Sequence, residues 1–313
     1  MGEVTPAEAL QKLQELLSKK EAGTLSPMEA ASSVMDYILS AYEGKTKPFI
    51  STGYKDLDNQ LGGGIVSSGL FTLAARPGTG KTTAALNIAD NIAAAGRTVL
   101  YISLEMGLEQ LWTRRAANLS GLGYNDIFAG RIRKDDNQWQ RLTDAFTVLS
   151  ERPLIIRDKP STIDDIELEA RCTKGLDLLI VDHIGLIRQL PEQKFFSRYE
   201  FMTNIAHRLK QLALSLHVPI LALCQLNRGS EQRNDKKPNM ADLRDSGAIE
   251  EDSDVVCLLF RESQYLPDES KPKPWEKQTI DFIVDKNRHG CTGTVTLDFY
   301  GINAKIIEKE KFR

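Results

Sequence analysis

Residues 74–83 read AARPGTGKTT, and this stretch decides the fold that we expect for the chain. An aliphatic run at 70–75 precedes it and predicts a strand, while the amphipathic segment at 82–95 predicts a helix. A glycine-rich turn between a strand and a helix is the context of a phosphate-binding loop. The glycines let successive backbone N–H groups surround a phosphate, and the helix start adds partial positive charge. We therefore predict a nucleotide site at this turn.

The loop itself supplies the predicted ligands for ATP. Lys81 would reach the β and γ oxygens, and the Thr82 hydroxyl would bind Mg²⁺. Ala75 occupies a position where such loops usually carry glycine, but it lies before the residues that touch phosphate. The competing interpretation is a turn without a ligand, which the flanking strand and helix disfavour. The residues expected to bind the nucleotide are Arg76, Pro77, Gly78, Thr79, Gly80, Lys81, Thr82 and Thr83.

Short aliphatic runs alternate with longer amphipathic segments through most of the chain, including a helical one at 201–216. This pattern is typical of an α/β fold, with a mostly parallel central sheet flanked by helices. Past Lys277 the pattern changes to two alternating strands joined by a turn with His289 and Gly290, which predicts a C-terminal antiparallel hairpin. The expected strands are 70–75, 99–103, 154–157, 178–182, 220–223, 255–260, 280–285 and 295–299.

Two short helices are predicted before this core, and they begin in the same way. TPAE at 5–8 and SPME at 26–29 both match a capping box with proline at the first helical position. The second helix carries an apolar stripe and ends at Gly44, so it should pack either on its own domain or on a neighbouring subunit. We expect residues 1–47 to form this extension and 48–313 to form one ATPase domain.

Composition and charge narrow the class of protein. Hydrophobic residues make up 41% of the chain and charged residues 27%, as in a soluble folded protein. We expect a cytoplasmic protein without a membrane span, because the chain has no apolar run of about 18 residues, no secretion signal and no paired cysteine spacing. The formal net charge of −3 means that a nucleic-acid partner would have to be bound by local basic loops.

Three polar residues stand at the ends of predicted strands and are candidates for catalysis. Glu105 follows the strand at 99–103 and could orient an attacking water. Asp182 closes the strand at 178–182 and could hold Mg²⁺, while Gln225 follows a third strand and could sense the γ-phosphate. Acids and amides also occur at strand ends without a catalytic role. Taken together with the loop, the two acids favour an ATPase.

Several stretches resemble a known family. STG at 51–53 and GGG at 62–64, together with the phosphate loop, resemble the opening of RecA-like ATPases. Four further segments look like the ATPase domain of DnaB-type replicative helicases, and the resemblance runs in order over about residues 48–313. It implies a RecA-like fold and an ATP-hydrolysing, ring-forming helicase that moves along single-stranded DNA in replication. The segments are SLEM at 103–106, CQLNR at 224–228, DLRDSGAIEEDSD at 242–254 and DKNRHGCTG at 285–293.

The resemblance implies a role for each candidate residue. It makes Glu105 the catalytic carboxylate, Asp182 the Mg²⁺-binding acid and Gln225 the relay to the DNA loops. Lys286 and Arg288 become fingers that reach the γ-phosphate bound by the adjacent subunit, so the active form would be a homo-oligomeric ring, by resemblance a hexamer. The alternative for this basic pair is a solvated hairpin with no ligand.

The DNA contacts have two candidate locations. The resemblance places contacts to the DNA backbone at Arg244, Asp245 and Gly247. Two basic segments, at 188–198 and from Arg228 to Lys237, follow sheet strands and could track phosphates, with an aromatic residue stacking on bases. The alternative for both segments is solvated surface charge. The aromatic candidates are Phe195 and Phe196.

The chain also departs from the family pattern. Only about 47 residues precede the core, so the resemblance does not extend to the globular amino-terminal domain or to its contact with primase, whereas a helicase loader stays open as a partner. His183 stands where an aromatic residue is usual, and Cys224 stands where serine is usual and is expected to be buried and unreactive. Two other functions remain open: a nucleotide-switched assembly or signalling ATPase, and a strand-exchange recombinase that forms filaments.

Overall fold

The structure is a computed structural model, and it describes residues 26–44, 48–133, 137–190, 197–227, 233 and 235–309. For residues 244–248 it describes the course of the backbone. The chain divides into two units, Met1–Pro48 and Phe49–Arg313. In the described part of the chain, no helix is both long enough and apolar enough to cross a membrane.

The described part of the first unit is one helix, α2 (Pro27–Tyr42). It begins at the predicted capping box: the Ser26 hydroxyl accepts from the backbone N–H of Glu29 at 3.3 Å, and the Glu29 carboxylate accepts from the backbone N–H of Ser26 at 2.7 Å. No residue of α2 is buried, and its large apolar side chains are at least half exposed. These side chains are Met28, Val34, Met35, Tyr37, Ile38, Leu39 and Tyr42. The first predicted helix lies outside the described residues.

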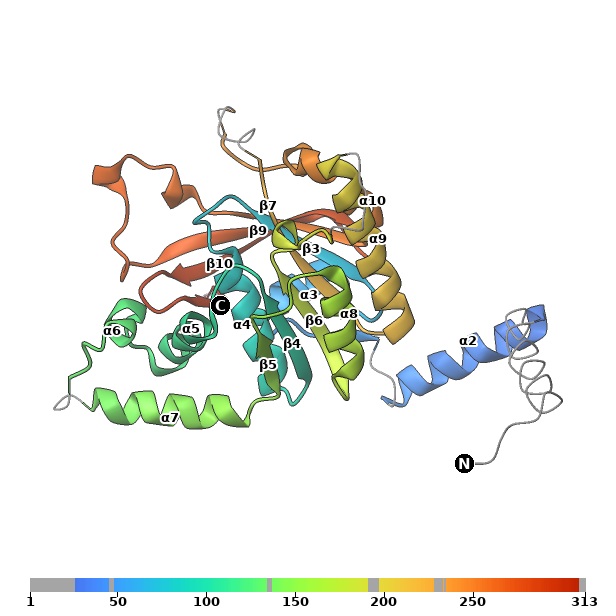
Figure 1. Cartoon of the computed structure of the whole chain (residues 1–313), viewed down its shortest axis with the longest axis horizontal. Helices are drawn as coiled ribbons and strands as arrows, with labels where there is room; N and C mark the ends of the chain where they lie inside the picture. The colour runs from blue at the N-terminus through green and yellow to red at the C-terminus, as the bar shows by residue number, and fades with distance from the viewer. Residues whose placement is uncertain are drawn as a thin grey trace. The chain divides into compact units, whose positions relative to one another are not determined.

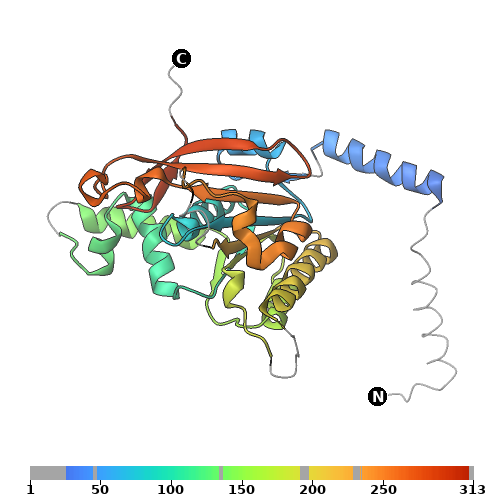
Figure 2. The same cartoon turned by 90° about the horizontal axis from the view of Figure 1, so that it is seen from above.

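The second unit is built on a nine-stranded sheet in the order β11-β10-β9-β8-β3-β7-β6-β4-β5 (Figure 1). The six strands from β3 to β8 run parallel, and β9 to β11 pair antiparallel at one edge, where Figure 2 shows the C-terminal strands in red. This confirms the predicted fold and the C-terminal antiparallel pairing. The strands are β3 (Leu70–Ala75), β4 (Thr98–Ser103), β5 (Leu154–Arg157), β6 (Leu176–Asp182), β7 (Ile220–Gln225), β8 (Val255–Phe260), β9 (Gln278–Asn287), β10 (Gly293–Tyr300) and β11 (Lys305–Ile307).

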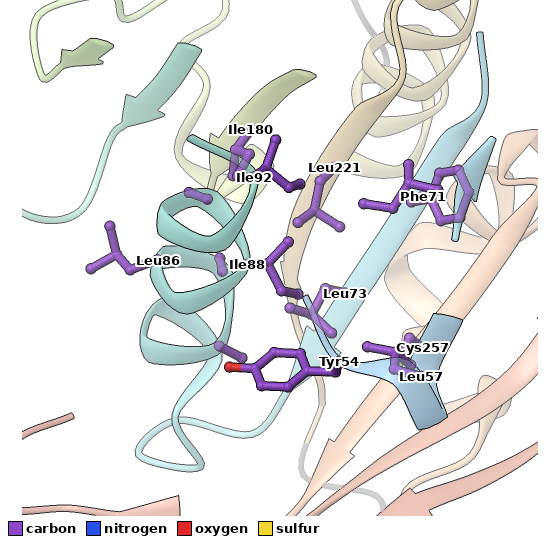
Figure 3. Packing of buried hydrophobic residues seen from close by; sticks show 14 of the residues in the cluster. Tyr54, Leu57, Phe71, Leu73, Leu86, Ile88, Ile92, Ile180, Leu221 and Cys257 are labelled. Atoms are coloured by element: carbon purple, nitrogen blue, oxygen red, sulfur yellow. The ribbon is translucent and has the colours of Figure 1, made fainter. Parts of the chain in front are cut away.

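Helices cover both faces of the sheet. The central strand β3 has every residue buried, and alternate side chains join two different cores. Phe71 and Leu73 pack with Ile88 of α4 on one face (Figure 3), while Leu70 and Ala74 pack against α8 and α9 on the other. A strand buried on both faces explains the continuous apolar run in the sequence. The helices of this unit are α3 (Lys55–Leu61), α4 (Lys81–Ala94), α5 (Leu108–Ser120), α6 (Tyr124–Phe128), α7 (Gln138–Glu151), α8 (Ile163–Cys172), α9 (Arg198–Leu216) and α10 (Gly247–Asp252).

Some elements differ from the prediction, each for a local reason. Helix α9 begins at Arg198, three residues before the expected start, because the Ser197 hydroxyl accepts from the backbone N–H of Glu200 at 3.1 Å and caps it there. A separate two-stranded sheet, β1 (Phe49–Ile50) with β2 (Ile65–Val66), was not predicted, and neither was β11. Strands of two or three residues are too short to show an alternating pattern in the sequence.

Candidate active site

The phosphate loop connects β3 to α4 as the sequence predicts. Gly78 and Gly80 have φ values of +77° and +114°, a region that side chains disfavour. A Cβ atom on Gly80 would also lie 3.3 Å from the Phe299 ring, so glycine is required there for two reasons. Among the described residues, no acceptor is recorded for the backbone N–H groups of Gly78, Gly80 and Lys81. These donors are therefore available to an anion at the start of α4.

A cavity of about 370 Å³ opens above this loop and brings several predicted residues together. Seven of the eight expected nucleotide-binding residues line it, as do Glu105 and Gln225. Thr79 is the exception: it is buried, and its hydroxyl donates to the Gln264 side chain at 2.8 Å. The lining residues are Ala75, Arg76, Pro77, Gly78, Gly80, Lys81, Thr82, Thr83, Glu105, Met106, Arg114, Tyr124, Gln225, Arg261, Phe299, Gly301 and Ala304.

Asp182 ends β6 beside this cavity and has no exposed surface. Its Oδ2 accepts from the Thr82 hydroxyl at 2.7 Å and from the Tyr101 hydroxyl at 2.8 Å. Burial, followed by the charge of Asp182, raises the pKa of Tyr101 well above its ordinary value, so Tyr101 stays a protonated donor. The Lys81 Nζ atom lies 3.4 Å from Oδ1. The predicted acid, hydroxyl and lysine thus meet at one point.

This arrangement fits a magnesium ion. Oxygen atoms of Thr82 and Asp182 are adjacent, and Asp182 Oδ1 is a buried acceptor with no hydrogen-bond donor among the described residues. Mg²⁺ in nucleotide sites is bound by one or two protein oxygens, with phosphates and waters completing its shell. Within the described residues, no group of three or more His, Cys, Asp or Glu side chains could hold a metal ion, so a site built on protein ligands alone is not recorded there.

Glu105 and Gln225 lie at the same edge of the sheet. Glu105 is exposed in the turn after β4, which Ser103 fixes by donating from its hydroxyl to the Met106 carbonyl at 2.7 Å. Gln225 ends β7 and lines a second cavity of about 260 Å³ that also contains His183. Among the predicted site residues that the structure describes, Gln225 is the one that lines both cavities.

The neighbouring Cys224 and His183 carry no charge at neutral pH. Burial raises the pKa of Cys224 to about 12, which agrees with the expectation that it is not a nucleophile. Burial, with a contribution from Lys81, lowers the pKa of His183 to about 4, so this imidazole is neutral.

Four of the lining residues that the sequence did not single out form two pairs of a guanidinium with an aromatic ring. The Arg114 guanidinium lies 5.2 Å from the ring centre of Tyr124, and that of Arg261 lies 4.7 Å from the ring centre of Phe299. Arg114 and Tyr124 come from the consecutive helices α5 and α6, whereas Arg261 follows β8 and Phe299 lies in β10, so no local spacing relates all four. Arg261 alone carried a signal, because it directly follows a predicted strand, as Gln225 was expected to do.

Lys286 and Arg288 do not line the cavity of their own protomer. Lys286 Nζ donates to the backbone carbonyls of Glu250 at 2.5 Å and of Glu251 at 3.2 Å. Arg288 donates to the Glu251 carbonyl at 2.8 Å and lies 3.4 Å from Asp254 Oδ1. Burial, followed by the charge of Arg288, lowers the pKa of Lys286. The pair is therefore more structured than a freely solvated hairpin.

The position of this pair in the sheet separates it from its own phosphate loop. Lys286 pairs with Val256 at the start of β8, whereas β8 ends next to Arg261 and the loop. A strand rises about 3.3 Å per residue, so these two ends of β8 are about 17 Å apart. Lys286 and Arg288 thus lie at the opposite end of β8 from their own phosphate loop.

The structure describes only some of the residues that were predicted to contact DNA. Arg244 and Asp245 lie in the 3₁₀ segment η3 (Met240–Ser246), and Gly247 begins α10. Arg228, Phe195 and Phe196 lie outside the described residues. In the described part of the second basic segment, Arg233 is paired with Asp242 of the same chain, so its charge is not free for a ligand.

Comparison with known proteins gives one consistent family. The family described as "DnaB-like helicase C terminal domain" matches residues 49–308. Replicative DNA helicase DnaB of Geobacillus stearothermophilus is 34% identical over 97% of this chain and 66% of its own length. Replicative DNA helicase DnaC of Bacillus subtilis (strain 168) is 37% identical over 84% of this chain and 57% of its own length. The chain thus spans about three fifths of the length of these relatives.

Solved structures agree with the family match. One of them, described as an ATPase domain, has a TM-score of 0.80 at 30% identity, covering 92% of this chain and 100% of that one. A DnaB-like replicative helicase, solved in a study of its interactions with primase, has a TM-score of 0.78 at 29% identity and covers 97% of this chain and 72% of that one. The RadB recombinase, at 18% identity and a TM-score of 0.52, shares the fold alone.

Proposed function

Because this chain belongs to the family of DnaB-like helicase C-terminal domains, we propose that it is the motor of a ring-forming DNA helicase. The proposed activity is hydrolysis of ATP with Mg²⁺, coupled to movement along single-stranded DNA in replication. The single observation that supports it most is the meeting of Lys81, Thr82 and Asp182 beneath the phosphate loop. This is the arrangement that a nucleoside triphosphate with its metal requires.

Each residue of the site would have a distinct task in hydrolysis. The phosphates would bind the free N–H groups of the loop, and Lys81 would turn from Asp182 to the β and γ oxygens. Thr82 and Asp182 would hold Mg²⁺, which supplies charge neutralisation when bound. Glu105 is exposed on the cavity wall, so it could orient the attacking water. Gln225 would report the state of the γ-phosphate to the second cavity.

Lys286 and Arg288 would act on the nucleotide of the adjacent protomer. Their position supports this assignment, because they lie at the opposite end of β8 from their own loop. A positive group supplied by a neighbour typically accelerates phosphoryl transfer by about 10³–10⁵-fold. Hydrolysis would then depend on assembly of a ring, for which a hexamer is the proposed form. The exposed apolar stripe of α2 would dock on the neighbouring protomer.

Single-stranded DNA would run through the ring. The backbone at Arg244, Asp245 and Gly247 and the segment beginning at Arg228 are the proposed contacts. Phosphate contacts of this kind do not read sequence and weaken with salt. A helicase loader is a further proposed partner, whereas a contact with primase is not part of the proposal.

The test measures ATP hydrolysis and fork unwinding with and without single-stranded DNA, together with native mass. We expect turnover that rises with DNA, and Lys81→Ala should lose hydrolysis. A rate of ATP hydrolysis that does not change with added DNA would instead favour a nucleotide-switched assembly or signalling ATPase. Family membership disfavours this alternative. Filaments in place of closed rings would favour a recombinase.

A further inference from the structure

We propose that Gln264, together with Arg261, is a positioning residue that holds the phosphate loop in its binding shape. Both belong to the turn that follows β8, which contains the short 3₁₀ segment η4 (Glu262–Gln264). Gln264 Nε2 donates to the Pro77 carbonyl at 2.6 Å, and Arg261 Nη2 donates to the Gly78 carbonyl at 2.6 Å. The inference rests on the proposed nucleotide binding at this loop.

The hydrogen bonds of the loop carbonyls show what this turn does. The Arg76 carbonyl accepts from the backbone N–H of Thr79, and the Gly80 carbonyl accepts from that of Ala84, so the chain satisfies these two locally. Of the three carbonyls between them, those of Pro77 and Gly78 accept from the turn after β8 instead. A peptide unit directs its N–H and C=O groups in opposite directions. Holding the Pro77 carbonyl outward therefore keeps the N–H of Gly78, which has no acceptor among the described residues, available to the cavity, while holding the Gly78 carbonyl supports the turn that the Thr79 N–H closes onto Arg76.

Thr79 adds a third connection between the loop and this turn. It is 2% exposed, and its hydroxyl donates to Gln264 Oε1 at 2.8 Å. One amide thus binds two neighbouring loop residues, as donor to Pro77 and as acceptor from Thr79. This also explains why Thr79 alone among the expected binding residues points away from the cavity. Its hydroxyl shapes the loop and does not meet the ligand.

The turn itself is fixed to the antiparallel edge of the sheet. The Ser263 hydroxyl donates to the Gln278 side chain of β9 at 2.6 Å. The Arg261 guanidinium lies over the Phe299 ring of β10, which in turn lies close to Gly80. The phosphate loop is consequently held from one side by α4 and from the other by the turn after β8 and by Phe299 of β10, whereas the bond from Ser263 to β9 does not involve the loop.

Arg261 contributes charge as well as geometry. Among the described residues, no carboxylate is recorded in an ion pair with it, and its Nε atom is buried without an acceptor. Burial lowers its pKa, although a guanidinium stays charged at any physiological pH. A half-buried cation without an acidic partner beside the loop makes the cavity more favourable for phosphate.

The experiment compares ADP affinity, measured by calorimetry, for the full chain and three variants. Gln264→Ala removes both bonds of the amide, and Thr79→Val removes the shared one. Ser263→Ala is the matched control, because it breaks a hydrogen bond of the same turn that does not reach the loop. We expect Gln264→Ala to bind ADP about 10-fold more weakly and Ser263→Ala to stay within about twofold. The KM for ATP should rise in Gln264→Ala by a similar factor while kcat at saturation changes much less.

A double variant tests the hydrogen bond between the Thr79 and Gln264 side chains specifically. Since Gln264→Ala already removes the partner of the Thr79 hydroxyl, Gln264→Ala with Thr79→Val should bind ADP about as Gln264→Ala does alone. If the losses of ADP affinity in Gln264→Ala and Thr79→Val added fully in the double variant, the proposal would be overturned. Equal losses of ADP affinity in Gln264→Ala and Ser263→Ala would also overturn it. Normal ADP binding by Gln264→Ala would overturn the positioning role of Gln264 but not the proposed nucleotide site. If the unaltered protein bound no ADP, both the nucleotide site and this positioning role would be wrong.

Discussion

Asp182 shows at the scale of one residue how the fold prepares a site for an ion. A buried carboxylate is costly unless its surroundings compensate its charge. Here two hydroxyl groups donate to Oδ2, from Thr82 and Tyr101, and Lys81 lies beside Oδ1. Only one of the donors, Thr82, belongs to the phosphate loop. The carboxylate is thereby directed at the start of α4.

We predict that Asp182→Asn separates catalysis from stability. The amide keeps an oxygen acceptor for Tyr101 and Thr82 but loses the charge that would bind Mg²⁺, so ATP hydrolysis at saturating Mg²⁺ should fall by about 100-fold or more. Thermal unfolding should occur at the same or a higher temperature, because the cost of burying a charge is removed. A steady-state ATPase assay and a melting curve check the two parts, and hydrolysis at the original rate would contradict the Mg²⁺ assignment.

Helix α8 shows at the scale of an element how a cap fixes a boundary. The Thr162 hydroxyl accepts from the backbone N–H of Asp165 at 3.2 Å, and the Asp165 carboxylate accepts from the backbone N–H of Thr162 at 3.0 Å. This capping box satisfies donors that have no partner within the helix. It starts α8 so that Ile163 and Ile166 enter the core beside α9.

Removal of this cap should cost measurable stability. We predict that Thr162→Ala lowers the free energy of unfolding by about 1 kcal/mol. Thr147→Ala, in the exposed face of α7, is the control and should change it by less than about 0.5 kcal/mol. Urea unfolding of the three proteins measures both values, and an equal effect of the two substitutions would speak against the cap.

The same cap should make stability depend on pH in a defined direction. Hydrogen bonds from Thr162, and then from Ser161, lower the pKa of Asp165 below its ordinary 3.8. A group whose pKa is lowered by folding stabilises the protein above its ordinary pKa, and this contribution is lost as pH falls through the lowered value. The stability difference between the unaltered protein and Asp165→Asn should therefore be present at pH 7 and shrink below 3.8. Urea unfolding at several pH values tests this, and a difference that grows in acid would contradict it.

At the scale of the whole molecule, the proposed function requires that a neighbouring protomer complete the active site. The phosphate loop lies at one edge of the parallel strands and the pair Lys286 and Arg288 at the other. Two copies related by rotation could bring these edges together, whereas one copy cannot. In the proposed ring, the phosphate loop and the basic pair of one protomer would therefore belong to two different sites.

We predict that two inactive variants restore one another in mixtures. Lys81→Ala lacks a working loop but keeps Arg288, and Arg288→Ala should bind nucleotide yet not hydrolyse it. In a mixed ring, some loops of the Arg288→Ala protein would face an intact Arg288 of the other variant. Mixing them should raise hydrolysis above the sum of the separate preparations, as measured by turnover at fixed total protein. Absence of such recovery, with mixed rings shown by native mass, would contradict action in trans.

Helix α2 should decide assembly at the same scale. We predict that Ile38→Asp, placed in its exposed apolar stripe, lowers the native mass from that of a ring toward that of a protomer, because a charge would be buried in the proposed contact. Ser33→Asp adds the same charge away from this stripe and is the matched control. Native mass spectrometry and light scattering measure the result. Intact rings with Ile38→Asp would remove α2 from the interface.

The sequence by itself determined the layers, the strands of the parallel sheet and most of the residues around the phosphate loop. These features are local: strand and helix periods, a glycine turn, and polar residues such as Asp182 and Gln225 at strand ends, all readable along the chain. Because parallel strands end at one edge, such residues meet once the sheet forms. The role of Glu105 was predicted from its position after a strand, those of Lys286 and Arg288 came from family resemblance, and all three remain predictions.

Tertiary structure alone decided which distant groups surround that loop. They are Arg114 and Tyr124 of α5 and α6, Arg261 and Gln264 of the turn after β8, and Phe299 of β10, and no spacing in the chain relates these three regions. The order of strands in the sheet brings these groups together. Strand β8 lies beside β3 although about 180 residues separate them, and this puts the turn after β8 against the phosphate loop. The sequence of a strand shows which side chains that strand carries. Which strands become its neighbours depends on how the whole sheet packs, because the buried apolar surface is shared among all strands of the sheet.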